Sequence, residues 1–432
     1  MLSCFSILIL LLKSPNPNHM SQSIPKRILL FLGTVGPGLF LIAYNIGTGS
    51  IITMAKAGAD YGMSLFWTLV LSCIFTYVLM VAYGQVTLVS GNTALKNIKL
   101  HVPKLGKALA IYIMIALIIG ELLALMGIMG IVADLLQEAL RMLTGGMVST
   151  LLITLILIIA LATLLWHGRY QIFEKLLTVL VLLMAFCFIY VFVAVRPDLG
   201  VILKGMIPQI PREPGVLGLF AAMVGTTWSA AVFIVRSIVV SEKGWNVSHL
   251  ETEKKDAFVS AFMMLFLSGI IMAVAAGTLH LMGLHVTDTL ELIHLFEPIG
   301  GQVAAFILIA GITGAALSTV FPIVLIAPWL IADYTSKPRD IRSPLFRVLG
   351  VAGLLFGLGL QFIDERPPAM MIFSQAFQAF ILPAVTIPIL YLINKQSLMQ
   401  QHKASRLMNF GIVCVLLFGL LTSYFAFKEL IS

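Results

Sequence analysis

The chain contains a series of apolar runs that are each long enough to cross a lipid bilayer. A transmembrane helix needs about 20 predominantly apolar residues, and eleven such runs cover residues 28–57, 62–88, 107–133, 147–166, 174–195, 215–240, 257–283, 300–333, 345–363, 368–394 and 406–428. Charged residues make up 11% of the chain, whereas a soluble domain carries about a quarter. The sequence therefore predicts an all-α, multi-pass protein surrounded by the lipid bilayer.

The segment before the first run is too short to span a membrane. Its apolar residues 1–12 are separated from the rest by the irregular stretch KSPNPNH. We interpret residues 1–27 as a leader and cytoplasmic segment. Two hypotheses stay open: residues 1–19 are an uncleaved leader, or translation starts at Met20, which we favour. A signal peptide is disfavoured because no small-residue cleavage site follows Leu12.

Lysine and arginine residues concentrate on alternate loops. Positively charged loops stay in the cytoplasm, so this asymmetry predicts a cytoplasmic N-terminus, and we expect a bacterial inner membrane. The formal net charge is +8, but the basic residues face anionic lipid and form no continuous stripe. No nucleic-acid partner is therefore expected.

No pattern in the sequence indicates catalysis. The four cysteines are scattered without the spacing of a disulfide framework or zinc site. Nothing resembles a phosphate-binding loop, a nucleophile elbow or a catalytic triad. We therefore expect no enzyme activity and no cofactor.

Two of the runs are interrupted by small and polar residues. The first contains NIGTGS at 45–50, and the sixth contains GTTWS at 225–229. Non-helical backbone at membrane depth survives only inside protein or beside a wet cavity, and paired interruptions in two halves indicate a transporter's binding site. Because each half has five spans, the second half inserts upside down. The alternative is that these glycines only allow close helix packing.

The domain organisation follows from these two breaks. A transmembrane transporter domain is predicted over residues 28–428, with repeat one at about 28–196, repeat two at about 215–394 and an extra helix at 406–428. The predicted fold is an inverted repeat of five plus five helices, in which helices 1 and 6 are broken.

Three segments resemble the NRAMP family of divalent-metal transporters. GPGLFLIAYNIGTGSIITMAKAGADYGMSLFW at 36–67 is similar to the family's first helix, while ALSTVFPIVL at 316–325 and SQAFQAFILPAVTIPIL at 374–390 resemble its eighth and tenth helices. The likeness runs from about Ser21 through almost the whole chain. It implies a LeuT-like fold and alternating access around a central ion.

The chain departs from the family pattern at the metal site. The family's Asp-Pro-Gly-Asn run falls on residues 47–50, which are Gly-Thr-Gly-Ser, and its Met-Pro-His falls on residues 229–231, which are Ser-Ala-Ala. A later histidine becomes Arg236, and an acidic pair of helix 3 becomes Ile128 and Ile131. Loss of the thioether lowers the expected preference for soft metals, and loss of the carboxylate leaves room only for a hydrated ion in a wide cavity.

The family's remaining polar positions supply the candidate residues. Glu121, Gln375 and Arg347 match the family. The candidate ion- or substrate-binding residues are Gly47, Thr48, Ser50, Gly225, Thr226, Thr227, Ser229 and Gln375. The candidate metal ligands among them are Ser50, Ser229 and Gln375, and the coupling or ion-pair candidates are Glu121, Arg236 and Arg347.

Arg236 and Glu121 each have two open interpretations. Arg236 either reaches the cytoplasmic interface with its long side chain or provides a fixed charge that pairs with Glu121. In the second case proton coupling through this position is lost, because arginine does not deprotonate in proteins. Glu121 is either a buried ion-pair partner or the one remaining proton carrier.

Two functions are consistent with the sequence. The favoured one is an NRAMP-like secondary transporter of metal ions with altered selectivity, for hydrated magnesium or manganese, and with doubtful proton coupling. The alternative is a LeuT-like carrier of a small organic or zwitterionic solute, whose carboxylate would sit at the N-terminal ends of the half-helices.

Overall fold

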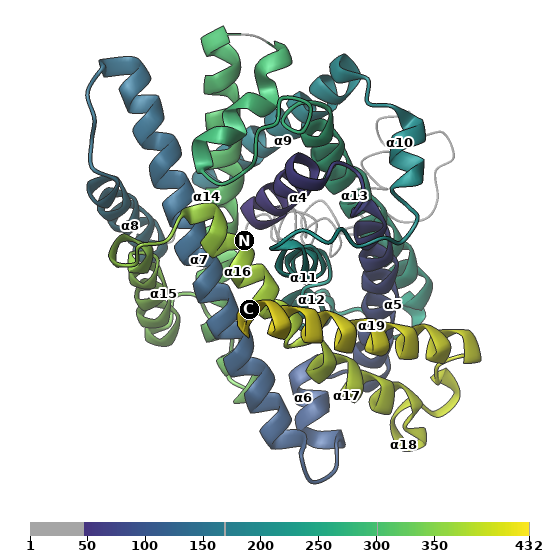
Figure 1. Ribbon diagram of the computed structural model, residues 1–432. Helices are drawn as coiled ribbons and strands as arrows, with labels where there is room; N and C mark the ends of the chain where they lie inside the picture. The colour runs from purple at the N-terminus through teal and green to yellow at the C-terminus, as the bar shows by residue number, and fades with distance from the viewer. Residues whose placement is uncertain (1–46, 168–169, 300, 432) are drawn as a thin grey trace, which may run out of the picture.

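The computed structural model describes residues 47–167, 170–299 and 301–431, and they are helical without a β-strand (Figure 1). The α-helices are α4 (Thr48–Tyr61), α5 (Phe66–Ser90), α6 (Ala94–His101), α7 (Gly106–Thr144), α8 (Thr150–His167), α9 (Tyr170–Val195), α10 (Leu199–Lys204), α11 (Val216–Thr227), α12 (Ala230–Glu242), α13 (Leu250–Gly277), α14 (Gly301–Tyr334), α15 (Pro344–Phe356), α16 (Pro367–Ala379), α17 (Leu382–Asn394), α18 (Gln396–Met399) and α19 (Arg406–Ile431). Short 3-10 helices are η1 (Val247–His249), η2 (Thr289–Ile299), η3 (Gly359–Phe362) and η4 (Gln400–His402).

The long helices match the predicted spans. Within the described residues, nine helical stretches are long and apolar enough to cross a membrane. Helix α9 corresponds to the fifth predicted span, and α4 begins inside the first. The first half of that span and residues 1–27, with both hypotheses about the start, lie outside the described residues. The chain is therefore a multi-pass membrane protein.

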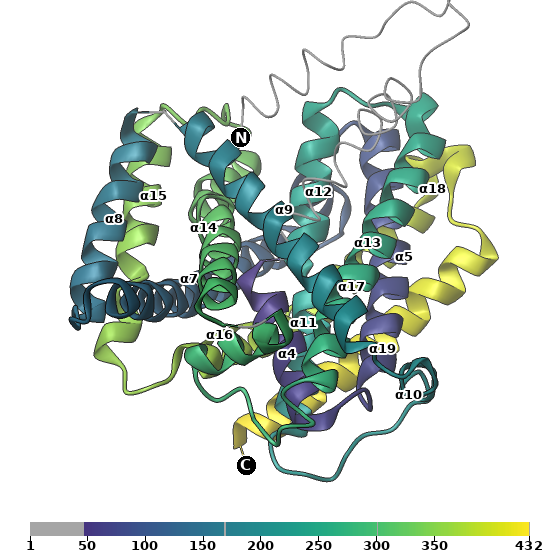
Figure 2. The same cartoon turned by 90° about the horizontal axis from the view of Figure 1, so that it is seen from above.

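The helices pack in pairs that relate the two halves of the chain. Helix α4 of the first half packs on α13, and α12 of the second half packs on α5. Helix α7 packs on its counterpart α14, and α8 packs on α15. Figure 2 shows α7, α8, α14 and α15 on one side of the molecule and α5, α12 and α13 on the other. This exchange of equivalent partners is the arrangement expected for an inverted repeat.

The sixth span is broken into α11 and α12 at Trp228 and Ser229, as predicted. The Trp228 N–H closes α11 by donating to the Val224 carbonyl oxygen at 2.7 Å. The Ser229 hydroxyl then caps α12 by accepting from the Ala231 N–H at 3.3 Å, which is the usual role of serine at a helix start. The Trp228 ring stacks on Phe418 of α19. The break is therefore held by its own hydrogen bonds and by an aromatic contact.

The tenth span is also divided, which the sequence analysis missed. Helix α16 ends at Ala379 and α17 begins at Leu382. Pro383 lies in the first turn of α17, where its missing N–H costs no hydrogen bond, but proline cannot donate to the preceding turn. The apolar run through residues 380–382 hid this boundary, although Pro383 was the available signal.

Candidate functional site

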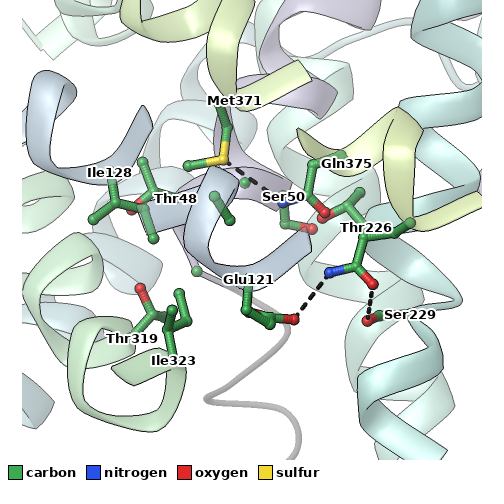
Figure 3. Close-up of a pocket in the computed structure, with 14 residues that line it drawn as sticks. Thr48, Ser50, Glu121, Ile128, Thr226, Ser229, Thr319, Ile323, Met371 and Gln375 are labelled. Carbon is green, nitrogen blue, oxygen red and sulfur yellow. Dashed lines mark hydrogen bonds between the residues drawn. The ribbon is translucent and has the colours of Figure 1, made fainter. Parts of the chain in front are cut away.

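A cavity of about 40 Å³ lies where the start of α4 and the break between α11 and α12 meet α7, α14 and α16 (Figure 3). Its lining residues are Gly47, Thr48, Gly49, Ser50, Glu121, Ala124, Ile128, Thr226, Ser229, Thr319, Ile323, Met371, Gln375 and Gln378. The polar side chains among them are buried. Since one water needs roughly 10–15 Å³, the cavity has room for about three or four waters. It is smaller than the wide cavity expected from the sequence.

The first turn of α4 forms one wall of the cavity. Gly47 is its N-cap in an extended conformation, and within the described residues no side-chain hydrogen bond caps the helix. The Thr48 hydroxyl makes no hydrogen bond with the described part of the chain, while the Ser50 hydroxyl lies 3.4 Å from the Ser268 hydroxyl of α13. A helix N-terminus carries a partial positive charge. A cation in the cavity therefore needs a negative group nearby.

Glu121 supplies that negative group from α7. Its Oε1 accepts a hydrogen bond from the Gln378 Nε2 at 2.9 Å, and the Gln378 Oε1 accepts one from the Ser229 hydroxyl at 3.5 Å. In Figure 3 these two contacts are the dashed lines that end at Glu121 and at Ser229. All three side chains are at most 5% exposed. The network connects the carboxylate of α7 to the start of α12 through α16.

Met371 and Gln375 form the opposite wall on α16. The Gln375 Nε2 lies 3.6 Å from the Met371 Sδ, and both side chains face Gly49 of α4. A Cβ atom at Gly49 would lie 2.6 Å from the Gln375 Nε2 and 3.5 Å from the Met371 Sδ. The absence of a side chain at residue 49 therefore leaves space for both groups beside the start of α4.

Six of the eight predicted binding residues line the cavity. They are Gly47, Thr48, Ser50, Thr226, Ser229 and Gln375, and they include all three candidate metal ligands. Gly225 and Thr227 do not line it. A Cβ atom at Gly225 would overlap the Gln375 carbonyl oxygen, so Gly225 lets α11 approach α16 closely. The Thr227 carbonyl oxygen accepts from the Thr76 hydroxyl at 3.1 Å, away from the cavity.

Arg236 neither pairs with Glu121 nor reaches the membrane interface, the two interpretations considered from the sequence. Its side chain is fully buried and does not reach the surface. Its Nε lies 2.8 Å from the Glu253 Oε1 and its Nη2 lies 2.8 Å from the Asp256 Oδ2, both on α13. The expected pair with Glu121 is thus replaced by a buried cluster that ties α12 to α13. Buried arginine requires such paired carboxylates.

Arg347 lies outside the cavity. Its guanidinium is 5.1 Å from the centre of the Trp166 ring, so it connects α15 to α8 by a cation–π contact. This position gives it no contact with the cavity lining. Glu121 is therefore the one coupling candidate that the structure places in the cavity.

Sequence reasoning missed three polar or soft side chains of the cavity: Thr319, Met371 and Gln378. Gln378 lies one helical turn from Gln375, a spacing that puts both on one face. This spacing was the available signal. Met371 also lies one turn from Gln375, but its apolar side chain did not mark it as a site residue, and Thr319 sits in an apolar stretch without such a neighbour.

The donor set of the cavity suits a cation only in part. Within the described ranges no three His, Cys, Asp or Glu side chains cluster as a metal site would. The cavity instead offers one carboxylate, two amides, several hydroxyls and one thioether. Neutral oxygens and a single carboxylate can coordinate a divalent ion weakly, provided that the carboxylate is ionised.

Comparisons with known proteins agree with this architecture. The family model described as "Natural resistance-associated macrophage protein-like" matches residues 38–428. A divalent metal cation transporter, MntH, of Nostoc sp. is 23% identical over 407 residues, covering 88% of this chain and 86% of that protein.

Solved structures share the fold. The manganese transporter of Eremococcus coleocola, in complex with an aromatic bis-isothiourea substituted compound, superposes with a TM-score of 0.65 at 17% identity, covering 94% of this chain and 89% of its own. MhsT in complex with L-phenylalanine superposes with a TM-score of 0.61 at 16% identity, covering 92% and 98%. The overall architecture is thus that of LeuT-like transporters.

Proposed function

Because the chain belongs to the Natural resistance-associated macrophage protein (Nramp) family, we propose that it is a secondary transporter that moves a divalent metal ion through the cavity by alternating access. The observation that carries the proposal is the position of Glu121. Although the family's aspartate is replaced by Gly47, a carboxylate from α7 lines the same cavity.

Charge compensation is the central requirement of such a site. The cavity adjoins the N-terminal, partially positive end of α4. The N-terminal end of α12, where Ser229 lies, also borders the cavity. A bare divalent cation at this place loses the free energy of hydration, and without a negative group nearby nothing offsets this loss. At about 4 Å, a carboxylate and each unit of cation charge attract by about 4 kcal/mol at an effective dielectric constant of about 20. One buried carboxylate thus makes occupancy by a dication feasible, at modest affinity.

The size of the cavity restricts the hydration of the ion. Space for about three or four waters excludes a complete shell of six around the ion. Magnesium gives up its water reluctantly, and the carboxylate and carbonyl oxygens of the cavity are donors that also suit manganese. We therefore propose manganese, or an ion like it, as the better substrate, in place of the hydrated magnesium considered from the sequence.

Proton coupling, if present, depends on Glu121. Arg236 is paired with two carboxylates and does not deprotonate, and Ile128 in the cavity wall cannot carry a proton. Glu121 is the titratable side chain of the described cavity lining. We propose that metal entry and protonation compete for this one carboxylate.

The test is flux in proteoliposomes with Glu121→Gln. The amide keeps the size of the side chain and removes its charge, so uptake of Mn²⁺ should fall by at least tenfold, the cost of about 1.4 kcal/mol. Glu138→Gln is the matched control, because Glu138 lies on the same helix but pairs with Arg141 outside the cavity. Equal Mn²⁺ uptake by wild type and Glu121→Gln would contradict the proposal.

A second candidate function is transport of a small zwitterionic solute. The first turn of α4, which no side chain of the described residues caps, favours this candidate, because N–H groups at a helix start bind carboxylates. The same liposomes should then take up amino acids and show no competition by divalent cations. The small cavity and the Glu121 carboxylate favour the metal ion instead.

A further inference from the structure

We propose that the thioether of Met371 is a metal ligand of the cavity and makes it selective for soft divalent ions. This inference rests on the proposed function and adds to it a residue that determines selectivity. It reverses the expectation that the loss of a methionine from the start of α12, where Ser229 stands, removes the soft donor. In the folded chain, a sulfur atom enters the same cavity from α16.

The first line of support is the position of the sulfur atom. Met371 lines the cavity and is completely buried. Figure 3 shows its sulfur directed toward Gln375 and the space beside α4. The nearest polar groups are the Gln375 Nε2 at 3.6 Å and the Ser374 hydroxyl at 3.8 Å. Both are long contacts to a weak acceptor, so a metal ion can replace them at little cost.

The second line of support is the packing that fixes residue 371. A Cβ atom at Gly127 of α7 would lie 3.1 Å from the backbone nitrogen and Cα of Met371, so α16 is pressed closely against α7 at this point. On the other side, Gly49 presents no side chain to the sulfur. Two glycines therefore bring the α16 backbone close and keep the space in front of the thioether open.

The third line of support is the mixture of donors. Thioether ligands favour soft transition metals, whereas carboxylate, amide and hydroxyl oxygens accept hard ions as well. The Glu121 carboxylate supplies the charge and the Gln375 amide lies next to the sulfur. Methionine is flexible enough to adjust its sulfur to an ion. The set predicts a preference for Cd²⁺ over Mg²⁺ and Ca²⁺.

The experiment compares two neighbouring methionines in the purified full-length protein. Met371→Leu removes the sulfur with little change in volume. Met370→Leu is the matched control, because Met370 is also buried but packs with Met126 and Leu360 in a separate cluster outside the cavity. Binding of Cd²⁺ and Mg²⁺ is measured by calorimetry, and X-ray absorption at the cadmium edge reports whether sulfur is bound.

Met371→Leu should weaken Cd²⁺ binding by about tenfold or more, as loss of a partner in a metal site does, and should leave Mg²⁺ binding unchanged. It should also remove the sulfur signal at the cadmium edge. Met370→Leu should change neither. Met371→Gln provides a second variant, which replaces sulfur by an amide oxygen and should shift the preference toward Mg²⁺.

The outcomes separate this inference from the proposed function. If the wild type binds Cd²⁺ without a sulfur signal, or if both Met371 variants keep the wild-type ratio of Cd²⁺ to Mg²⁺ affinity, the role of Met371 is wrong while metal transport stands. If the wild type binds no divalent ion, and Glu121→Gln has wild-type flux, the proposed function itself fails.

Discussion

Restoring a carboxylate at residue 47 tests whether Gly47 lines an ion site. Gly47 is the N-cap of α4 and has φ −91° and ψ −169°, a conformation that any residue can adopt. Aspartate is among the best N-cap residues. However, a Cβ atom at this position would lie 2.5 Å from the Thr319 Cγ2 of α14, well inside the contact distance of two carbon atoms. Gly47→Asp alone should therefore destabilise the protein.

The expected magnitudes follow from this contact and from the charge. Overpacking against Thr319 costs about 1–3 kcal/mol, while the N-cap offers only a few tenths over glycine. The double variant Gly47→Asp, Thr319→Ser removes the clashing methyl group and keeps the hydroxyl, which donates to the Ala316 carbonyl oxygen at 2.8 Å. At about 4 Å and a dielectric constant of about 20, a carboxylate attracts a dication by about 8 kcal/mol.

Desolvation of the new carboxylate takes back several kcal/mol of this attraction. We therefore expect a net gain of about 1.5–3 kcal/mol, or about 10- to 100-fold tighter Mn²⁺ binding. The assay is calorimetric titration of Mn²⁺ into the double variant, with Thr319→Ser alone as the control for the lost methyl group. Thermal melting of each variant reports the packing cost.

Two results would refute the reasoning. A folded double variant with the Mn²⁺ affinity of Thr319→Ser would mean that residue 47 does not face the ion. A single variant Gly47→Asp that melts at the wild-type temperature would mean that Thr319 does not restrict this position.

Two further predictions concern buried contacts. Arg236→Gln leaves the carboxylates of Glu253 and Asp256 buried without their cation, so it should lower the free energy of unfolding by about 3–5 kcal/mol. Adding Glu253→Gln to this variant should recover part of the lost stability in thermal melting. The absence of any recovery would argue against the ion pair. Gly225→Ala forces a methyl group onto the Gln375 carbonyl oxygen and should cost about 3 kcal/mol or more, whereas Gly146→Ala, at a glycine with only a hydroxyl oxygen nearby, should melt like the wild type.

Much of the fold could be predicted because the bilayer imposes length and polarity on every span. The apolar runs located the long helices, and the polar interruption at 225–229 located the break between α11 and α12. The starts of helices were less predictable. Helix α13 begins at Leu250, before the apolar run at 257, because charged residues such as Glu253 and Asp256 continue the helix once Arg236 neutralises them.

The cavity was predictable only where the breaks themselves formed it. Residues beside the interruptions, such as Thr48 and Ser229, line it. Its composition was only partly predictable from aligned positions, because a sulfur atom can enter the same space from a different helix. Glu121 of α7 was a candidate from the family match, whereas Met371 of α16 lies far along the chain from residue 229 and was not. The cytoplasmic N-terminus, the inner membrane and the repeat boundaries stay predictions.

Because the tenth span is divided, three of the side chains that line the cavity lie on one short helix. Met371, Gln375 and Gln378 all belong to α16, which ends at Ala379. Beyond residues 380–381, α17 is bound to α5, because the Tyr83 hydroxyl of α5 donates to the Val385 carbonyl oxygen at 2.7 Å. A tilt of α16 about residues 380–381 would move the Met371 sulfur and the Gln375 and Gln378 amides together. The three side chains would then change their distance from the other cavity walls as one rigid unit.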